Sequence, residues 1–91
     1  MQSAKKAIIV DVREDDEWQE QHIPGALHIP LSQLDKRMDE LKKQHSPLIM
    51  QCRSGKRSAK AQAALKAAGF ADVYNLEGGL MAWQQQGLSV E

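Results

Sequence analysis

The sequence predicts an α/β fold, a three-layer sandwich in which a mostly parallel sheet of four to five strands carries helices on both faces. Three observations predict it. Short apolar, β-branched runs alternate with longer runs of helical periodicity. The first short run is apolar nearly throughout, as in parallel strands that are buried on both faces. The intervals between the runs suit βαβ crossovers, which join parallel neighbours.

The 91 residues are expected to form one domain, residues 1–91, because no repeat, low-complexity segment or long linker divides them. A chain of this size buries roughly two-thirds of its unfolded surface, which is enough to fold without disulfides or metal. In chain order we expect a strand at 7–12, a helix from 15 or 16 to 21, a turn at 23–26, a strand at 27–30, a helix at 32–43, a strand at 48–51, a helix at 58–68, a strand at 73–76 and a helix at 80–86.

Local signals mark the elements of the first half. Asp15 or Asp16 can cap the first helix, and Trp18 is its inward anchor. Proline fixes φ and glycine frees it, so Pro24 and Gly25 make the next segment a turn.

The later helices show similar signals. Ser32 with Asp35 resembles a capping box. Small side chains let the helix at 58–68 lie close to the sheet, and Gly69 supplies its left-handed C-cap. Trp83 is the core anchor of the last helix. The inward-facing residues of the two middle helices are predicted to be Leu34, Met38 and Leu41, then Ala61, Ala64, Leu65 and Ala68.

Composition excludes several function classes. Acidic and basic residues balance at 12 each, which disfavours nucleic acid and anionic membranes as partners. One cysteine and three scattered histidines make neither a disulfide nor a zinc site, so no metal or cofactor is predicted.

No run approaches the roughly 20 apolar residues of a membrane span, and the start does not resemble a signal peptide. We expect a cytoplasmic monomer, although a periplasmic protein whose signal has been removed would look the same.

The single cysteine, Cys52, lies where the central strand passes into a helix, the edge at which parallel sheets bind ligands. Cations and helix N-termini lower thiol pKa values from about 8.5 to as little as about 3.5. Gly55 permits the positive φ that lets the amides of residues 53–58 point inward as an anion-binding nest. The cations around this loop are Arg53, Lys56, Arg57 and Lys60.

Loop length indicates which anion the loop holds. Phosphatases that use a cysteine nucleophile need C-x5-R, whereas Cys52 and Arg57 form C-x4-R, and Ser58 stands where the phosphatase arginine would be. The shorter loop suits one sulfur atom better than a tetrahedral phosphate. A phosphatase or arsenate reductase remains the alternative enzyme at this point.

Three blocks of sequence resemble single-domain rhodaneses, the thiosulfate sulfurtransferase-like family. They cover about residues 8–86, nearly the whole chain. The active-site loop is Cys52-Arg53-Ser54-Gly55-Lys56-Arg57-Ser58. The other blocks are Asp11-Val12-Arg13, Glu17-Trp18, His22-Ile23-Pro24-Gly25-Ala26 and Ile29-Pro30 towards the amino terminus, and Gly69-Phe70, Val73, Leu76, Gly78-Gly79 and Trp83 towards the carboxyl terminus.

The resemblance implies a role for each loop residue. Cys52 would be the nucleophile that takes sulfane sulfur from thiosulfate, holds it as a persulfide, and passes it to cyanide or a thiol. The amides of Arg53, Ser54, Gly55, Lys56, Arg57 and Ser58 would cradle the persulfide. Arg57, with Arg53 or Lys56, would bind the anionic donor. The mechanism would be ping-pong, without a cofactor or an obligatory general base.

The chain also departs from the family pattern. Members often have a further strand and helix before the Asp-Val-Arg strand, whereas about ten residues precede Asp11 here. The sheet is therefore expected to lack the family's first edge strand, which would leave an edge able to pair with a partner. Gln21 stands where many members have glycine.

Asp11 and Arg13 are expected to support the site. Asp11 should accept hydrogen bonds from loop amides or pair with an arginine rather than act in catalysis, and Arg13 should pair with Glu17 across the helix start. A packing or hydrogen-bonding role is expected for His22. The two remaining histidines are expected at the surface: His28 and His45.

Two alternatives without small-molecule turnover also stay open. A rhodanese-like binding module is one, although such modules usually lose the cysteine that this chain keeps. A sulfur relay is the other, in which the donor and acceptor are themselves proteins.

Overall fold

The computed structural model describes residues 7–90. It confirms the predicted α/β fold with a parallel sheet. All the strand pairs are parallel, and the strand order is β2-β1-β3-β4. The elements are β1 (Ile8–Asp11), α1 (Asp15–Glu20), β2 (Leu27–His28), the short 3-10 helix η1 (Leu31–Gln33), α2 (Leu34–Lys42), β3 (Leu48–Gln51), α3 (Lys56–Ala67), β4 (Val73–Asn75) and α4 (Gly79–Gln85).

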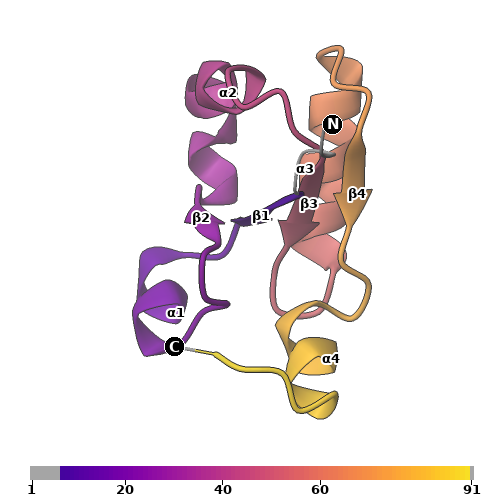
Figure 1. Ribbon diagram of the computed structural model, residues 1–91. Helices are drawn as coiled ribbons and strands as arrows, with labels where there is room; N and C mark the ends of the chain where they lie inside the picture. Colours follow the sequence, from indigo (N-terminus) through magenta and orange to yellow (C-terminus); the bar gives the residue numbers. More distant parts are fainter. Residues whose placement is uncertain (1–6, 91) are drawn as a thin grey trace, which may run out of the picture.

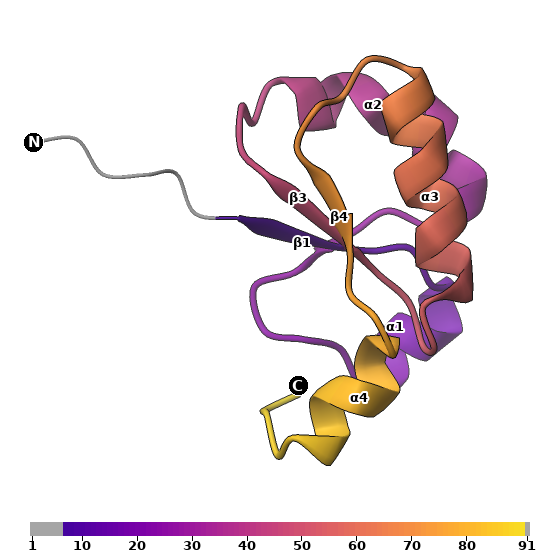
Figure 2. The same cartoon turned by 90° about the vertical axis from the view of Figure 1, so that its right-hand side faces the viewer.

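The helices occupy two regions around the sheet. Helices α2 and α3 lie on the same face, whereas α1 and α4 lie at the end where the strands finish (Figures 1 and 2). The main core fills the space between the sheet and the first pair of helices. Its buried members are Val10, Val12, Ile29, Leu34, Leu41, Leu48, Met50, Cys52, Ala61, Leu65 and Val73.

The other face of the sheet carries an apolar row. Ile9, Ile49 and Tyr74 are paired in register across β1, β3 and β4. The two isoleucines are half-buried, and Tyr74 is 54% exposed. Within residues 7–90, helix packing is therefore concentrated on one face and at the carboxyl end of the sheet.

The starts of several helices differ from their predictions. Helix α1 is capped by Glu14, and Asp15 and Asp16, the predicted caps, lie in its first turn. The capping box predicted at Ser32 is wrong: Ser32 is exposed within η1, and α2 begins at Leu34 without a side-chain cap. Helix α3 begins at Lys56 rather than Ser58, because Gly55 adopts a left-handed conformation (φ 103°) and lets the chain enter the helix two residues earlier. The second strand also stops early, at His28.

Several side chains lie elsewhere than predicted. Ala68 is exposed as the C-cap of α3, and Trp83 is only half-buried, with its indole N–H donating to the Ser89 carbonyl at 2.8 Å. Neither belongs to the core. His28 is not a surface residue, since its Nε2–H donates to the Arg13 carbonyl at 2.9 Å and its ring stacks on Trp18.

Trp18 organises α1 by stacking rather than by full burial. It is half-buried, and its ring centroid lies 3.8 Å from that of His22 and 4.7 Å from that of His28. The hydrogen-bonding role expected for His22 is confirmed, because its Nδ1 lies 2.9 Å from the Trp18 carbonyl oxygen. His45 is exposed, as predicted.

No helix among the described residues is long and apolar enough to cross a membrane.

A buried ion pair fixes the end of β1. Asp11 is fully buried and Arg13 is 3% exposed, and Arg13 Nη2 lies 2.8 Å from Asp11 Oδ2. Arg13 also donates to the backbone carbonyls of Gln21 at 2.6 Å and Glu17 at 3.4 Å. The arginine partner predicted for Asp11 is confirmed. The ion pair predicted between Arg13 and Glu17 is wrong, since Arg13 bonds the Glu17 backbone instead.

Removal of the Asp11 carboxylate would leave Arg13 buried without its counter-ion. We expect Asp11→Ala to lower the free energy of unfolding by about 3–5 kcal/mol, measured by urea denaturation. Glu40→Ala is the matched control because it breaks an exposed pair with Arg37, and it should cost about 0.2–1 kcal/mol. Similar losses in the two variants would show that the buried pair does not hold the fold.

Candidate active site

Cys52 lies directly after β3, at the start of the loop into α3. Its side chain is almost completely buried, with the residue 1% exposed. The donors that point at its sulfur include the backbone N–H of Gly55, at 3.0 Å from Sγ, and the hydroxyl of Ser58, at 3.5 Å. The loop therefore curls around a single sulfur atom.

This environment lowers the pKa of Cys52 below its ordinary value. Burial acts in the opposite direction, because it penalises the thiolate. Hydrogen bonds from the Ser58 side chain and from the backbone amides of Ser58, Gly55 and Ser54 outweigh it. The site favours a negative charge on sulfur chiefly through its loop donors.

Ser58 and Asn75 form a small network behind the sulfur. The Ser58 oxygen lies 2.5 Å from Asn75 Oδ1, and Asn75 Nδ2 donates to the Gly55 carbonyl at 3.3 Å. Ser58 has one hydroxyl proton, so Asn75 and the Cys52 sulfur compete for it. Asn75 thus links β4 both to the Ser58 hydroxyl, which faces the sulfur, and to the turn of the loop at Gly55.

Helix α4 supports the loop from outside. Its Leu80 N–H donates to the Cys52 carbonyl at 2.8 Å, and its Met81 N–H donates to the Arg53 carbonyl at 3.1 Å. The Gln51 side chain adds a further hydrogen bond to the Cys52 carbonyl, at 2.8 Å.

The approach of α4 to the loop requires glycine at position 79. A Cβ atom on Gly79 would lie against the Cys52 carbonyl oxygen and 2.6 Å from the Arg53 carbonyl carbon. Its φ of +56° also disfavours other residues.

The loop cations do not all remain available to an anion. Arg57 forms a two-pronged ion pair with Glu17 of α1, with Nη1–Oε1 and Nη2–Oε2 distances of 2.7 and 2.9 Å. The hydrogen bond from Arg57 lowers the pKa of Glu17 to about 2. The guanidinium of Arg57 thus joins the loop to α1, and its expected role in binding the anionic donor stays a prediction. Within residues 7–90, Arg53 and Lys56 are exposed and have no hydrogen-bonding or ion-pair partner on their side chains.

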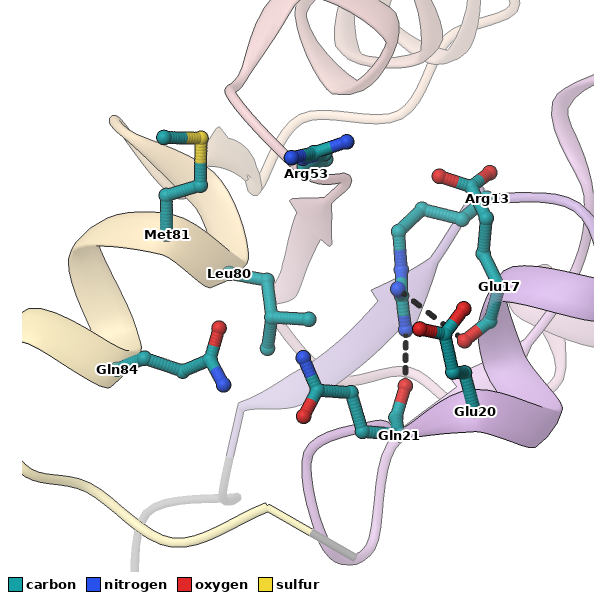
Figure 3. Close-up of a pocket in the computed structure, with 8 residues that line it drawn as sticks. All are labelled: Arg13, Glu17, Glu20, Gln21, Arg53, Leu80, Met81 and Gln84. Atoms are coloured by element: carbon teal, nitrogen blue, oxygen red, sulfur yellow. Dashed lines mark hydrogen bonds between the residues drawn. The ribbon is translucent and has the colours of Figure 1, made fainter.

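A cavity of about 220 Å³ opens beside the loop, between α1 and α4 (Figure 3). Arg53 borders it on the loop side. The amides of Gln21 and Gln84 face each other across it. Its lining residues are Arg13, Glu17, Glu20, Gln21, Arg53, Leu80, Met81 and Gln84.

No group of three or more His, Cys, Asp or Glu residues in the described part of the chain is placed to hold a metal ion.

The residues of the loop were predicted from the sequence, but the residues outside it that hydrogen-bond to the loop were not. Asn75 and Gln51 are the polar residues of otherwise apolar strands, and that contrast could have identified them. Glu17 was assigned to the wrong arginine, because its partner lies 40 residues away along the chain.

Comparison with known proteins agrees with this geometry. A model of the rhodanese-like domain matches residues 1–86. The chain belongs to this family. It is 34% identical over 77 residues to the thiosulfate sulfurtransferase GlpE of Coxiella burnetii, covering 85% of this chain and 71% of that protein. The structure of a rhodanese-like domain protein from Staphylococcus aureus superposes with a TM-score of 0.83 at 36% identity, covering 97% of this chain and 84% of that one.

Some relatives of this rhodanese-like chain are much longer. It is 40% identical over 87 residues to the probable adenylyltransferase/sulfurtransferase MoeZ of Mycobacterium tuberculosis. The match covers 94% of this chain but only 22% of MoeZ.

The Ser58 hydroxyl should contribute directly to thiolate formation. We expect Ser58→Ala to raise the pKa of Cys52 and to slow its alkylation by iodoacetamide at pH 7 by roughly threefold to tenfold. The measurement is the alkylation rate as a function of pH. Ser32→Ala, an exposed serine far from the loop in sequence, is the control. An unchanged pH profile would mean that Asn75 holds the Ser58 proton.

The close contact at Gly79 should make this glycine more sensitive than others with positive φ. We expect Gly79→Ala to lower the free energy of unfolding by about 3–5 kcal/mol, through strain and overlap together. Gly25→Ala is the control, because φ is +81° there but nothing lies within 4 Å of the added Cβ, and it should cost about 1–2 kcal/mol. Equal losses in urea denaturation would argue against the tight contact of α4 with the loop.

Proposed function

We propose that this chain is a sulfurtransferase that carries sulfane sulfur as a persulfide on Cys52. The observation that carries the proposal is the cradle itself. Donors from Gly55 and Ser58 converge on Sγ, and the pKa of this thiol is lowered. A sulfur atom held there as an anion receives the stabilisation that a nucleophilic thiolate needs.

The first half-reaction loads the cysteine. The Cys52 thiolate attacks the outer sulfur of thiosulfate, a new S–S bond forms, and the old S–S bond breaks. Its electron pair leaves with sulfite, and the outer sulfur remains on Cys52 as a persulfide anion. The loop amides stabilise negative charge on sulfur before and after the transfer.

The exposed cations favour an anionic donor. Arg53 and Lys56 are both exposed beside Cys52 and are the residues that we assign to thiosulfate. Arg57 positions the loop through its bond to Glu17. A direct contact of Arg57 with the donor, which the sequence led us to expect, would require this pair to open.

The second half-reaction discharges the persulfide. Cyanide or a thiolate attacks the terminal sulfur, the bond to Cys52 Sγ breaks, and the cysteine returns as a thiolate. Neither half-reaction needs an external oxidant or reductant, and none of the steps uses a cofactor. A protein donor and acceptor would use the same chemistry, which makes the chain a sulfur relay.

The phosphatase alternative has less support. The position at which a phosphatase would place its arginine is Ser58, which is buried and lies 3.5 Å from Sγ. An arginine at that place would offer two parallel donors to a phosphate, and serine offers one shared hydroxyl. A cytoplasmic location and a monomeric state remain predictions.

The test is mass spectrometry after treatment with thiosulfate. We expect a gain of one sulfur atom, about 32 Da, on Cys52. Cyanide should remove it, and Cys52→Ser should never acquire it. Failure to gain sulfur from any sulfane donor would exclude the transferase. Brisk hydrolysis of p-nitrophenyl phosphate would favour the phosphatase instead.

A further inference from the structure

Asn75 is a polar residue of β4 whose side chain faces the active-site loop. It is paired in register with Met50 of β3, two residues before Cys52, and it is half-buried. Its amide hydrogen-bonds to two loop residues, with Oδ1 2.5 Å from the Ser58 oxygen and Nδ2 3.3 Å from the Gly55 carbonyl oxygen. These are the two residues whose O–H and N–H face the sulfur. Asn75 can therefore act on the sulfur through the donors that surround it.

The Gly55 carbonyl fixes which way the Asn75 amide points. A carbonyl oxygen only accepts hydrogen bonds, so it requires the NH2 group of Asn75 on its side. The amide oxygen then faces Ser58, and this oxygen also only accepts. Because the Ser58 hydroxyl has one proton, it donates either to Asn75 or to Cys52 Sγ.

The charge on the sulfur decides between these two acceptors. The Ser58 oxygen lies 2.5 Å from Asn75 Oδ1 and 3.5 Å from Sγ, and an uncharged sulfur is a weak acceptor. An uncharged Sγ therefore leaves the proton to Asn75. A thiolate is a charged acceptor, and hydrogen bonds to ionised groups are roughly twice as strong as neutral ones. Formation of the thiolate turns the hydroxyl towards sulfur.

We propose that Asn75 is a positioning residue for sulfur transfer, which takes the Ser58 hydrogen bond while Sγ is uncharged and yields it when the thiolate forms. The consequences for the two half-reactions rest on the proposed function. In the persulfide the negative charge lies on the terminal sulfur, so the Ser58 proton goes to Asn75. When an acceptor attacks the terminal sulfur, the S–S bond breaks and its electron pair goes to Sγ. The hydroxyl then rotates to Sγ, and no proton leaves Ser58.

This exchange affects the two half-reactions in different ways. A thiolate that is stabilised leaves faster but attacks less readily. In discharge Sγ is the leaving group, and the Ser58 hydroxyl stabilises it. In loading Sγ is the nucleophile, and Asn75 competes for the same hydroxyl. Asn75 thus limits the stabilisation of the attacking thiolate without removing the donor that the leaving thiolate needs.

The pH profile of Cys52 alkylation by iodoacetamide tests the exchange without any sulfur transfer. Asn75→Ala removes the competing acceptor, so the Ser58 hydroxyl is left to the sulfur. We expect the pKa of Cys52 to fall by about half a unit to one unit, whereas Ser58→Ala raises it. A purely structural role of Asn75 predicts the opposite sign, because a loosened loop would move its donors away from Sγ. Asn75→Leu, which fills the space of the amide, is the second variant and should also lower the pKa.

Two further variants separate the exchange from damage to the fold. Gln62→Ala is the matched control, because Gln62 of α3 donates to the Val73 carbonyl of β4 at 3.0 Å and so bridges the same helix and strand without bonding to the loop. Its alkylation profile should stay unchanged. In the double variant of Asn75→Ala with Ser58→Ala the hydroxyl is gone, so the profile should match that of Ser58→Ala alone. A pKa that rises in both Asn75 variants, or a double variant that differs from Ser58→Ala, would overturn the assignment.

Single-turnover kinetics connect the exchange to sulfur transfer. At a pH where the thiolate is fully formed, Asn75→Ala should slow loading by thiosulfate about twofold to threefold and should not slow discharge by cyanide. Equal slowing of the two half-reactions would contradict the proposal. If the alkylation profiles move as expected but no sulfane donor loads Cys52, the role of Asn75 stands and the proposed transferase fails. If Cys52 is loaded but the pKa does not fall in either Asn75 variant, the transferase stands and the role of Asn75 is wrong.

Discussion

The active-site loop obeys one constraint from which much of its surroundings follows. A backbone that turns its N–H groups inward towards Cys52 Sγ must turn carbonyls outward, and buried carbonyls need donors. The first turn of a helix has amides without intrahelical partners. Helix α4 supplies two of them, from Leu80 and Met81, to the Cys52 and Arg53 carbonyls. Each element therefore satisfies the hydrogen-bonding groups that the other leaves open, and the contact is close enough to require glycine at position 79.

An ion pair connects the same loop to α1, on the side of the site opposite α4. Arg57 joins it to Glu17 of α1, while the Arg13 side chain, held by Asp11, bonds two carbonyls at the end of α1. Helix α1 is thus held by two arginines, by Arg13, which follows β1, and by Arg57, which belongs to α3. Since Arg57 is occupied in this way, the lowered pKa of Cys52 depends mainly on the hydrogen-bond donors of the loop, and the cavity between α1 and α4 keeps walls of both signs.

The parts of the site that could be predicted from sequence are those encoded by neighbouring residues. The lone Cys52 between an apolar strand and a helical run, with Gly55 in between, was enough to predict the cradle. The helix start at Lys56 was missed because the conformation of Gly55 decides it, and composition does not reveal φ. The pair predicted between Arg13 and Glu17 was wrong for another reason, although an arginine partner was expected for Asp11. Sequence spacing favours a pair four residues apart, whereas the fold offers Arg57 to one and Asp11 to the other.

The dimensions of the cradle bear on the choice between sulfur and phosphate. The Gly55 amide lies 3.0 Å from Sγ, so it is already within hydrogen-bonding distance of the thiolate. A persulfide adds one atom about 2.05 Å beyond Sγ, and the charge it carries moves by that distance only. A phosphoryl group would instead bring three further oxygens, each of which needs donors of its own. Ser58 faces the cysteine at 3.5 Å with a proton that it shares with Asn75. Donors that converge on one atom in this way match a monoatomic anion better than a tetrahedral one.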